Sequence, residues 1–510
     1  MKKMSRREFL KAAGATTIAT AALSAPTVWV KNAAAQKKEY MGSLWKPSPQ
    51  QDKLWKQYSG ETVYILTENT PPSVGIRGAA SDFTALTGMK AEFTLEPMDP
   101  LTEKVFLDLR SGAPKYHVNY GQPQTIGNVV CEYWQPLNKF FDVKTGISKF
   151  PDLPDVPDVP FGMHAAFMPN HVEQGSMFYD EGIWYAMPYD TAMGVIFFRT
   201  DLVEKYGKKF EDKYGKSFKP GGEYDYEHLL EMGKFINENC KEVDKGLGFH
   251  MAQYWAINQD YVTFLTAWGV KKEGFAHINN WSLGSRMPGP YLDDPKDFEK
   301  AVSVVDYMRR LSEVMHPDSR IWDWGGLGTA HATGKIAIQS NCGEFCPYVE
   351  DPKESVIAGK VGYAVQPRGP AGIHAYEVGA SGLGIPAALP WKEQRKALIF
   401  VLWATGPAAQ WKAFTEYYGT PVRTTAYEEA RKKGWLEEDS TFRKAQHLRI
   451  QDIQMRKHLD GFGMGPKIPT YTKYIDITGG ELNKWISGEY KKPEEVLKVM
   501  QTRMNRLHGV

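Results

Sequence analysis

Side chains that bind hydroxyl groups recur in this chain where apolar runs end. Glu68 and Asn69 come directly after one such run, and Tyr120 and Gln122 follow another. Carboxylates and amides have forked polar groups that bind hydroxyls, and aromatic planes cover the flat C–H faces of a sugar ring. Aromatic residues make up 13% of the chain, with 15 Trp, 26 Tyr and 24 Phe. These residue types indicate a binding site for a hydroxylated solute.

We select the candidate binding residues from loops at strand ends, where ligand sites of α/β folds lie. The set is Glu68, Asn69, Tyr120, Gln122, Tyr189, Asp190, Trp255, Asp260, Glu344, Phe345, Ser381, Arg423 and Tyr471. Rings are expected to stack on the solute, carboxylates and Arg423 to bind its hydroxyls, and Ser381 to let the solute approach the backbone. The alternatives are a core position for Trp255 and a structural ion pair for Arg423.

Motifs that would indicate catalysis or a metal are missing. The stretch from Gly379 to Leu383 lacks the second glycine of a serine-nucleophile elbow, and no His-Glu-x-x-His zinc motif occurs. Cys342 and Cys346 lack further ligands at zinc spacing, so they form either a local disulfide or two free thiols. We therefore expect no catalytic residue, no metal and no cofactor. An exported glycoside hydrolase with two carboxylates is the alternative from another class.

The first 35 residues have the pattern of an export leader. Arg6 and Arg7 precede a mildly apolar stretch over 12–30, and Ala33-Ala34-Ala35 suits a signal peptidase. The arginine pair followed by Phe-Leu-Lys resembles the twin-arginine export motif. The first cysteine is Cys131, which excludes a lipid anchor at the cleavage site. We expect an unanchored periplasmic protein, because no other apolar run reaches the ~18 residues of a membrane span.

Charge and length narrow the class of protein. The leader holds six of the 62 Lys and Arg and one of the 60 Asp and Glu, which leaves 56 basic and 59 acidic residues and a net charge of −3. That balance argues against a nucleic-acid partner, which needs a basic face. A chain of this length is expected to divide into about two domains or lobes.

The elements expected around the candidate residues alternate between strand and helix. Strands are predicted over 61–68 and 90–95, and helices over 77–87 and 101–111, with Gly88 as a helix stop. This rhythm predicts an α/β lobe with a largely parallel sheet. Separately, 150–161 is predicted to be a solvated Pro-Asp loop, 208–222 a polar insertion, and 493–507 an amphipathic helix.

Six blocks of the chain resemble the family 1 extracellular solute-binding proteins, the maltose-binding-protein-like group. They lie, in the order of the family, at Gly182–Thr191, Val195–Leu202, Gly328–Gln339, Val378–Ile385, Gly419–Arg423 and Pro466–Pro469. Each block is weak alone, and six in register are specific. They cover about residues 60 to 510, so the resemblance extends over almost the whole expected mature chain.

This resemblance implies a type II periplasmic binding protein fold with two α/β lobes, each a mixed, mostly parallel sheet flanked by helices. The lobes would be 36–187 with 367–418 and 190–364 with 422–510, joined by crossings near 188–190, 364–367 and 418–422. A monomer would capture a carbohydrate or polyol between the lobes and deliver it to the permease of an ABC importer. A charged solute (a phosphate ester, polyamine or osmolyte) is the alternative cargo.

Overall fold

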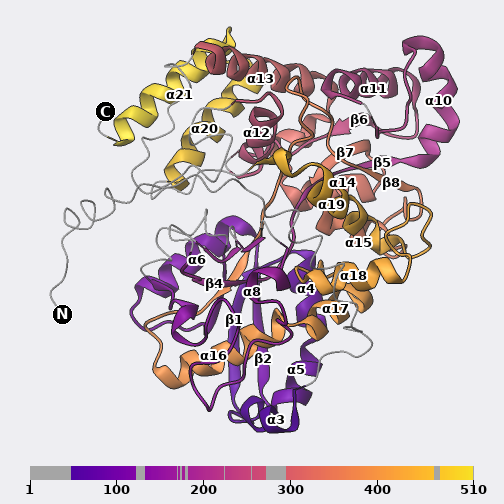
Figure 1. The fold of residues 1–510 in the computed structure, drawn as a ribbon. Coiled ribbons are helices and arrows are strands. Elements are labelled where there is room, and N and C mark those ends of the chain that lie inside the picture. The colour runs from indigo at the N-terminus through magenta and orange to yellow at the C-terminus, as the bar shows by residue number, and fades with distance from the viewer. Residues whose placement is uncertain are drawn as a thin grey trace.

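The computed structural model describes residues 47–121, 133–168, 171–172, 175–177, 182–222, 224–253, 255–270, 295–463 and 471–508. The expected leader over 1–35 and the candidate Gln122 lie outside these residues. The described chain folds into two lobes, one above the other in Figure 1, each built around its own sheet.

The first lobe surrounds a five-stranded sheet with the order β2-β1-β3-β10-β4. Its strands are β1 (Thr62–Glu68), β2 (Lys90–Glu96), β3 (Val118–Gly121), β4 (Ala186–Pro188) and β10 (Gly382–Gly384). Helices of this lobe are α3 (Pro49–Trp55), α4 (Pro71–Gly78), α5 (Ala80–Thr87), α6 (Met98–Arg110), α8 (Met163–Ala166), α16 (Trp391–Ala404), α17 (Pro407–Glu416) and α18 (Thr424–Lys432).

The second lobe surrounds a four-stranded sheet with the order β6-β7-β5-β8. Its strands are β5 (Gly194–Arg199), β6 (Lys245–Gly248), β7 (Ile336–Cys342) and β8 (Val361–Ala364), and β9 (Tyr376–Glu377) pairs with β11 (Phe462–Gly463) beside them. Its helices are α10 (Thr200–Tyr214), α11 (Tyr226–Asn239), α12 (Trp255–Ala267), α13 (Pro295–Val314), α14 (Trp324–Ala332), α15 (Cys346–Val349), α19 (Gln446–Lys457), α20 (Tyr471–Ile486) and α21 (Pro493–His508).

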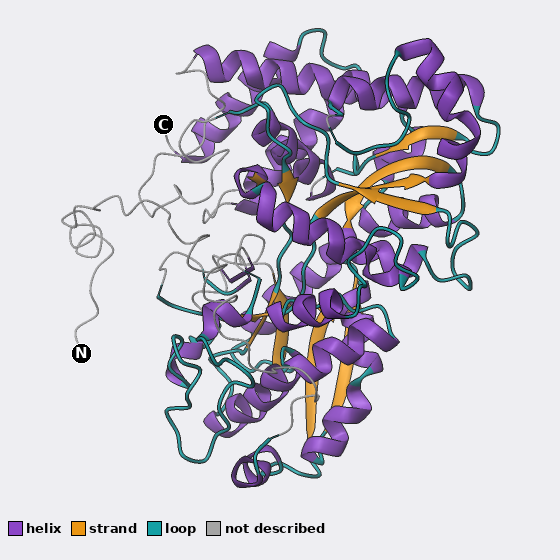
Figure 2. Cartoon of the chain, turned by 45° about the vertical axis from the view of Figure 1, so that its right-hand side comes forward, coloured by secondary structure: helices purple, strands orange, loops and turns teal. Residues whose placement is uncertain are grey.

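Burial explains the apolar sequence of β5. Every residue of β5 and β7 is buried, which is the pattern of strands covered by helices on both faces. Figure 2 shows purple helices on both sides of the orange sheets. The α/β class with mixed sheets is confirmed, but parallel pairing does not dominate among the described strands. β10 is antiparallel to β3 and β4, and β5 is antiparallel to β7 and β8.

Most of the predicted helices and strands begin and end within a few residues of those in the structure. The predicted stop at Gly88 is confirmed, since this residue ends α5 in the left-handed conformation with φ 73°. The predicted helix over 77–87 is two helices, α4 and α5, which meet at Ala79. The predicted insertion at 208–222 begins as helix, because α10 continues to Tyr214 and only then ends at Gly215.

The Pro-Asp segment at 150–161 forms a loop without helix or strand, as predicted, but it is less solvated than expected. Leu153 and Val156 are 2% and 5% exposed and join the core of the first lobe. The alternating Pro and Asp residues hide this burial in the sequence, because apolar residues three apart in a loop have no helical or strand periodicity.

Two connections between the lobes run side by side. Residues 189–193 lead from β4 to β5, and 378–381 return to β10. Gly379 N donates to Ala192 O at 2.7 Å, and Tyr189 N donates to Ser381 O at 2.9 Å. The return lies later than the expected crossing near 364–367, because the chain first forms β9 within the second lobe.

A third connection follows α18. Thr424 Oγ1 donates to Ala165 O at 2.9 Å, so this helix still packs on the first lobe. The chain therefore crosses between α18 and α19, over 433–445, later than the expected 418–422.

The described helices include none that is long and apolar enough to span a membrane. Of the two alternatives for Cys342 and Cys346, the structure has two free thiols and not a local disulfide.

Candidate functional site

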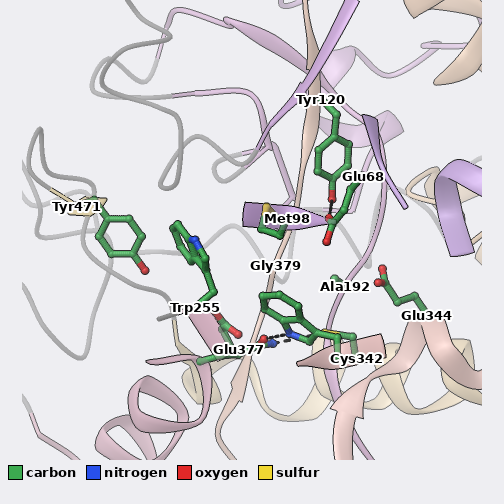
Figure 3. Close-up of a pocket in the computed structure, with 12 residues that line it drawn as sticks. Glu68, Met98, Tyr120, Ala192, Trp255, Cys342, Glu344, Glu377, Gly379 and Tyr471 are labelled. Carbon is green, nitrogen blue, oxygen red and sulfur yellow. Dashed lines mark hydrogen bonds between the residues drawn. The ribbon is translucent and has the colours of Figure 1, made fainter. Parts of the chain in front are cut away.

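A pocket that opens to solvent, with about 500 Å³ of space including that open solvent, lies between the lobes beside the two adjacent connections (Figure 3). Residues from both lobes and both connections line it: Glu68, Met98, Tyr120, Ala192, Trp255, Gln259, Trp324, Cys342, Glu344, Glu377, Gly379 and Tyr471. Ala192 and Gly379 are small, so the pocket reaches the backbone of the connections.

The first-lobe wall is a hydrogen-bond network centred on the phenol of Tyr120. Tyr120 lies on β3 and Glu68 ends β1, and parallel pairing of these strands brings their carboxyl ends together. The phenol oxygen lies 2.7 Å from Glu68 Oε2 and 3.1 Å from Asp190 Oδ2. Ser381 Oγ donates to the same phenol at 2.6 Å, and Ser381 N donates to Asp190 Oδ1 at 3.1 Å. The network thus ties the first lobe to both connections.

Burial controls the charge of this network. Burial raises the pKa of Glu68 to about 8, against the hydrogen bond from Tyr120, and the charge of Asp190 raises it further. Burial also raises the pKa of Asp190 to about 7, against the hydrogen bonds from Ser381 and Tyr120. These two carboxyls therefore hold a proton to higher pH than exposed carboxyls do, and a protonated carboxyl can donate a hydrogen bond as well as accept one.

The second-lobe wall carries the rings. Trp255, Trp324 and Tyr471 are the first residues of α12, α14 and α20, and Asp323 caps α14 by accepting from Gly326 N at 2.8 Å. The rings of Trp255 and Tyr471 lie 5.3 Å apart between centroids. Trp324 Nε1 donates to Gln259 Oε1, which fixes the indole at the pocket. These helix starts form an aromatic surface of the kind that covers a sugar face.

Two more carboxyls face the pocket from the second lobe. Glu344 lies in the short turn after β7, and burial raises its pKa well above the ordinary value, with further contributions from the charges of Asp190 and Glu68. Glu377 lies on β9, and its pKa is raised first by burial and then by the charge of Asp260. The acids of the two lobes therefore act on one another across the pocket.

Five of the thirteen sequence candidates line the pocket, and three more stand directly behind its wall. The lining ones are Glu68, Tyr120, Trp255, Glu344 and Tyr471. Asp190 and Ser381 hold Tyr120, and the ring of Tyr189 packs edge-on against the same phenol ring, with 6.0 Å between centroids. The fold thus brings Glu68 and Tyr471 together although they are more than 400 positions apart in the chain.

The structure does not bring the remaining described candidates into the pocket wall. Asn69 is exposed beyond β1. Asp260 accepts from His250 N at 3.0 Å beneath the second-lobe wall, and Phe345 packs in the core near β7. The guanidinium of Arg423 donates twice at 2.6 Å, to the carbonyls of Pro157 and Asp158. Arg423 therefore takes the structural alternative, although its partners are carbonyls and not the acid side chain that we expected.

The lining residues that the sequence analysis missed are Met98, Ala192, Gln259, Trp324, Cys342, Glu377 and Gly379. For Trp324 a signal existed, because Asp323 is a helix-capping residue and a ring directly after a cap lies at the exposed start of a helix. Met98 likewise starts α6 after Pro97. The others lie in a connection, in the middle of α12 or on buried strands, where local sequence carries no mark of a ligand.

Comparison with known proteins identifies the class. Residues 78–443 match the family model for the bacterial extracellular solute-binding protein. The chain therefore belongs to the bacterial extracellular solute-binding proteins, a family of exported binding proteins.

Solved structures share the two-lobed periplasmic binding protein fold. An ABC transporter solute-binding protein from Agrobacterium radiobacter K84, in complex with ribitol, is 18% identical with a TM-score of 0.67, over 88% of this chain and 99% of its own. Maltose-bound MalE3 of T. maritima is 16% identical with a TM-score of 0.68, over 88% and 100%. A D-mannitol-bound protein of Agrobacterium vitis S4 is 18% identical with a TM-score of 0.65, over 88% and 99%. These likenesses establish the fold.

Proposed function

We propose that this protein captures a carbohydrate or polyol between its two lobes and delivers it to the membrane subunits of an ABC importer. The observation that carries the proposal is the inter-lobe pocket, which combines rings on one wall with carboxyls on both. Rings and carboxyls are the groups that bind the faces and hydroxyls of a sugar. The structural neighbours with ribitol, maltose and D-mannitol support this class of solute.

Export belongs to the same proposal. The arginine pair and the small-residue run before Gln36 support passage by the twin-arginine route, cleavage of the leader and action in the periplasm. The protein is proposed to act as a monomer. Among anionic cargoes, a phosphate ester is disfavoured, because no described lining residue is Lys, Arg or His. The protein would release its solute chemically unchanged, in contrast to a glycoside hydrolase.

The test is thermal unfolding of residues 36–510 against sugars, polyols, sugar acids, phosphate esters and amines. A solute at about 100 times its Kd stabilises the native protein by about 2.7 kcal/mol, which raises Tm by roughly 3 °C for a chain of this size. We expect a saturable shift with a sugar or polyol that is recovered intact. A shift confined to anions, or turnover of a glycoside, would contradict the proposal.

The aromatic wall provides a matched variant. Trp255 is half-buried at the start of α12, so its removal leaves most of the core intact. Trp255→Ala is expected to weaken binding of the stabilising solute about tenfold, and Trp255→Phe to retain most of the affinity. Titration calorimetry measures both. Equal affinity of wild type and Trp255→Ala would exclude this ring from the site.

A further inference from the structure

The ionisable carboxyl groups of the pocket have no basic counterpart among the described lining residues. Glu68, Glu344 and Glu377 line it, and Asp190 stands behind Tyr120, whereas none of the lining residues that the structure describes is basic. Neutral solutes need hydrogen-bond donors and acceptors from their site, but they need no excess of one charge. An all-acidic lining therefore needs an explanation beyond hydroxyl binding.

Glu344 is the acid with the least support from the chain. It is only 4% exposed, and Figure 3 shows its carboxyl group directed toward the pocket beside Ala192. Glu344 lines the pocket, and no hydrogen bond joins its carboxyl group to another residue in the described part of the chain. Oε2 of Glu377, which also lines the pocket, is fully buried without a partner. A buried carboxylate costs free energy unless it is paired, so the missing donor is expected to arrive with the solute.

A metal ion is a poor candidate for that donor. No group of three or more His, Cys, Asp or Glu within the described ranges could hold one. The acids are instead spread around the pocket, with Glu68 at the end of β1 and Glu344 after β7. The starts of α12 and α14 bring partial positive charge to the second-lobe wall. No described group at the start of either helix donates a hydrogen bond to Glu344.

We propose that the pocket selects a polyhydroxylated solute that carries a protonated amine, with the ammonium group between Glu344 of the second lobe and Glu68 of the first. The inference rests on the proposed function and narrows its class of solute to amino sugars and amino polyols. An ammonium group has three donors and no acceptor, which matches the carboxyl group of Glu344 and the oxygen of Glu68 that Tyr120 does not bind. The rings of Trp255 and Trp324 add a surface that also favours a cation. Because the ammonium group would contact both lobes, its binding would favour closure of one lobe onto the other.

The test compares compounds that differ in one nitrogen: glucose with glucosamine and N-acetylglucosamine, galactose with galactosamine, and sorbitol with 1-amino-1-deoxysorbitol. Titration calorimetry at pH 7 measures each Kd on residues 36–510. A hydrogen bond to a charged group contributes about 1.5–3 kcal/mol, so we expect the amine of at least one pair to bind roughly tenfold tighter or better than its hydroxyl partner. The acetylated compound should lose that gain because its nitrogen is uncharged.

Glu344→Gln keeps the shape of the side chain and removes its ability to ionise against an ammonium group. We expect it to weaken binding of the amine about tenfold and of the neutral partner by less than about threefold. Glu354→Gln is the matched control, because Glu354 is exposed on the same lobe. This substitution removes one surface charge from the same protein. It should leave both affinities unchanged.

The outcomes separate the two proposals. Neutral members that bind as tightly as their amines, or more tightly, would overturn the amine inference and leave the proposed function standing. Absence of binding by every compound of every pair, together with no sugar or polyol hit in the thermal panel, would overturn the proposed function itself. The wild-type comparison decides the inference even if Glu344→Gln does not fold.

Discussion

Tyr120 is the residue on which the polar half of the pocket depends. One phenol is shared by Glu68, Asp190 and Ser381, so three segments from different parts of the chain meet at a single oxygen. Such a buried network is rigid while every member is satisfied, and costly when one member is lost. Both carboxyls titrate far from their usual range because the network lies away from water.

A pH dependence of stability follows from Glu68. Its pKa is raised from 4.5 to about 8 in the folded protein, so the folded state holds a proton that the unfolded state has released. The stabilisation is therefore complete below pH 4.5 and is lost as the pH rises toward 8. Glu68→Gln should flatten the decline of the free energy of unfolding by up to about 1.4 kcal/mol per pH unit.

Urea denaturation of the ligand-free protein at pH 5, 6, 7 and 8 measures that slope. Glu354→Gln, at an exposed position, should keep the slope of the wild type. An unchanged slope in Glu68→Gln would mean that this carboxyl titrates near its ordinary pKa.

At the scale of elements, the buried side chain of Arg423 helps to join α18 to the first lobe. Arg423 precedes this helix, is 1% exposed, and places its guanidinium 4.7 Å from the centroid of the Phe167 ring. Its two hydrogen bonds hold the carbonyls of Pro157 and Asp158, so it fastens the Pro-Asp loop as well. Burial lowers the pKa of Arg423 to about 10, and it remains a cation at neutral pH.

Arg423→Met tests this structural role. It leaves two carbonyls without donors and should lower the free energy of unfolding by about 2–4 kcal/mol. Arg431→Met on the same helix breaks only a surface ion pair with Asp452 and should cost less than about 1 kcal/mol. Denaturant unfolding compares the two variants. If Arg423→Met instead abolished solute binding at unchanged stability, Arg423 would be a binding residue.

At the scale of the whole molecule, the pocket belongs to neither lobe alone. Figure 1 shows the two lobes one above the other, with chain segments passing between them. The connections beside the pocket are short and hydrogen-bonded to each other, so small backbone changes in 189–193 and 378–381 would rotate one lobe against the other.

Closure is therefore expected when a solute touches both walls. Small-angle X-ray scattering of residues 36–510 should give a smaller radius of gyration with a saturating solute from the thermal panel than without it. The Trp255→Ala variant should contract only at higher solute concentration. Superimposable scattering curves for free and saturated protein would contradict closure upon binding.

The sequence by itself determined the class of fold and much of the first-lobe wall. Apolar runs and helix stops such as Gly88 are local, so β1, β2 and the end of α5 were predictable to within a residue or two. Glu68 and Tyr120 were predictable for the same reason, because strand ends are visible in the sequence and parallel strands bring them to one edge.

Only the tertiary structure decided which residues share the pocket with them. Trp324, Glu377 and Gln259 come from three elements of the second lobe, and nothing local shows that these elements face the first. The environment of Arg423 was equally hidden, since its carbonyl partners lie more than 260 positions earlier in the chain. Whether a polar side chain lines a cavity or fastens a loop depends on the packing of distant segments, and packing is settled by the fold as a whole.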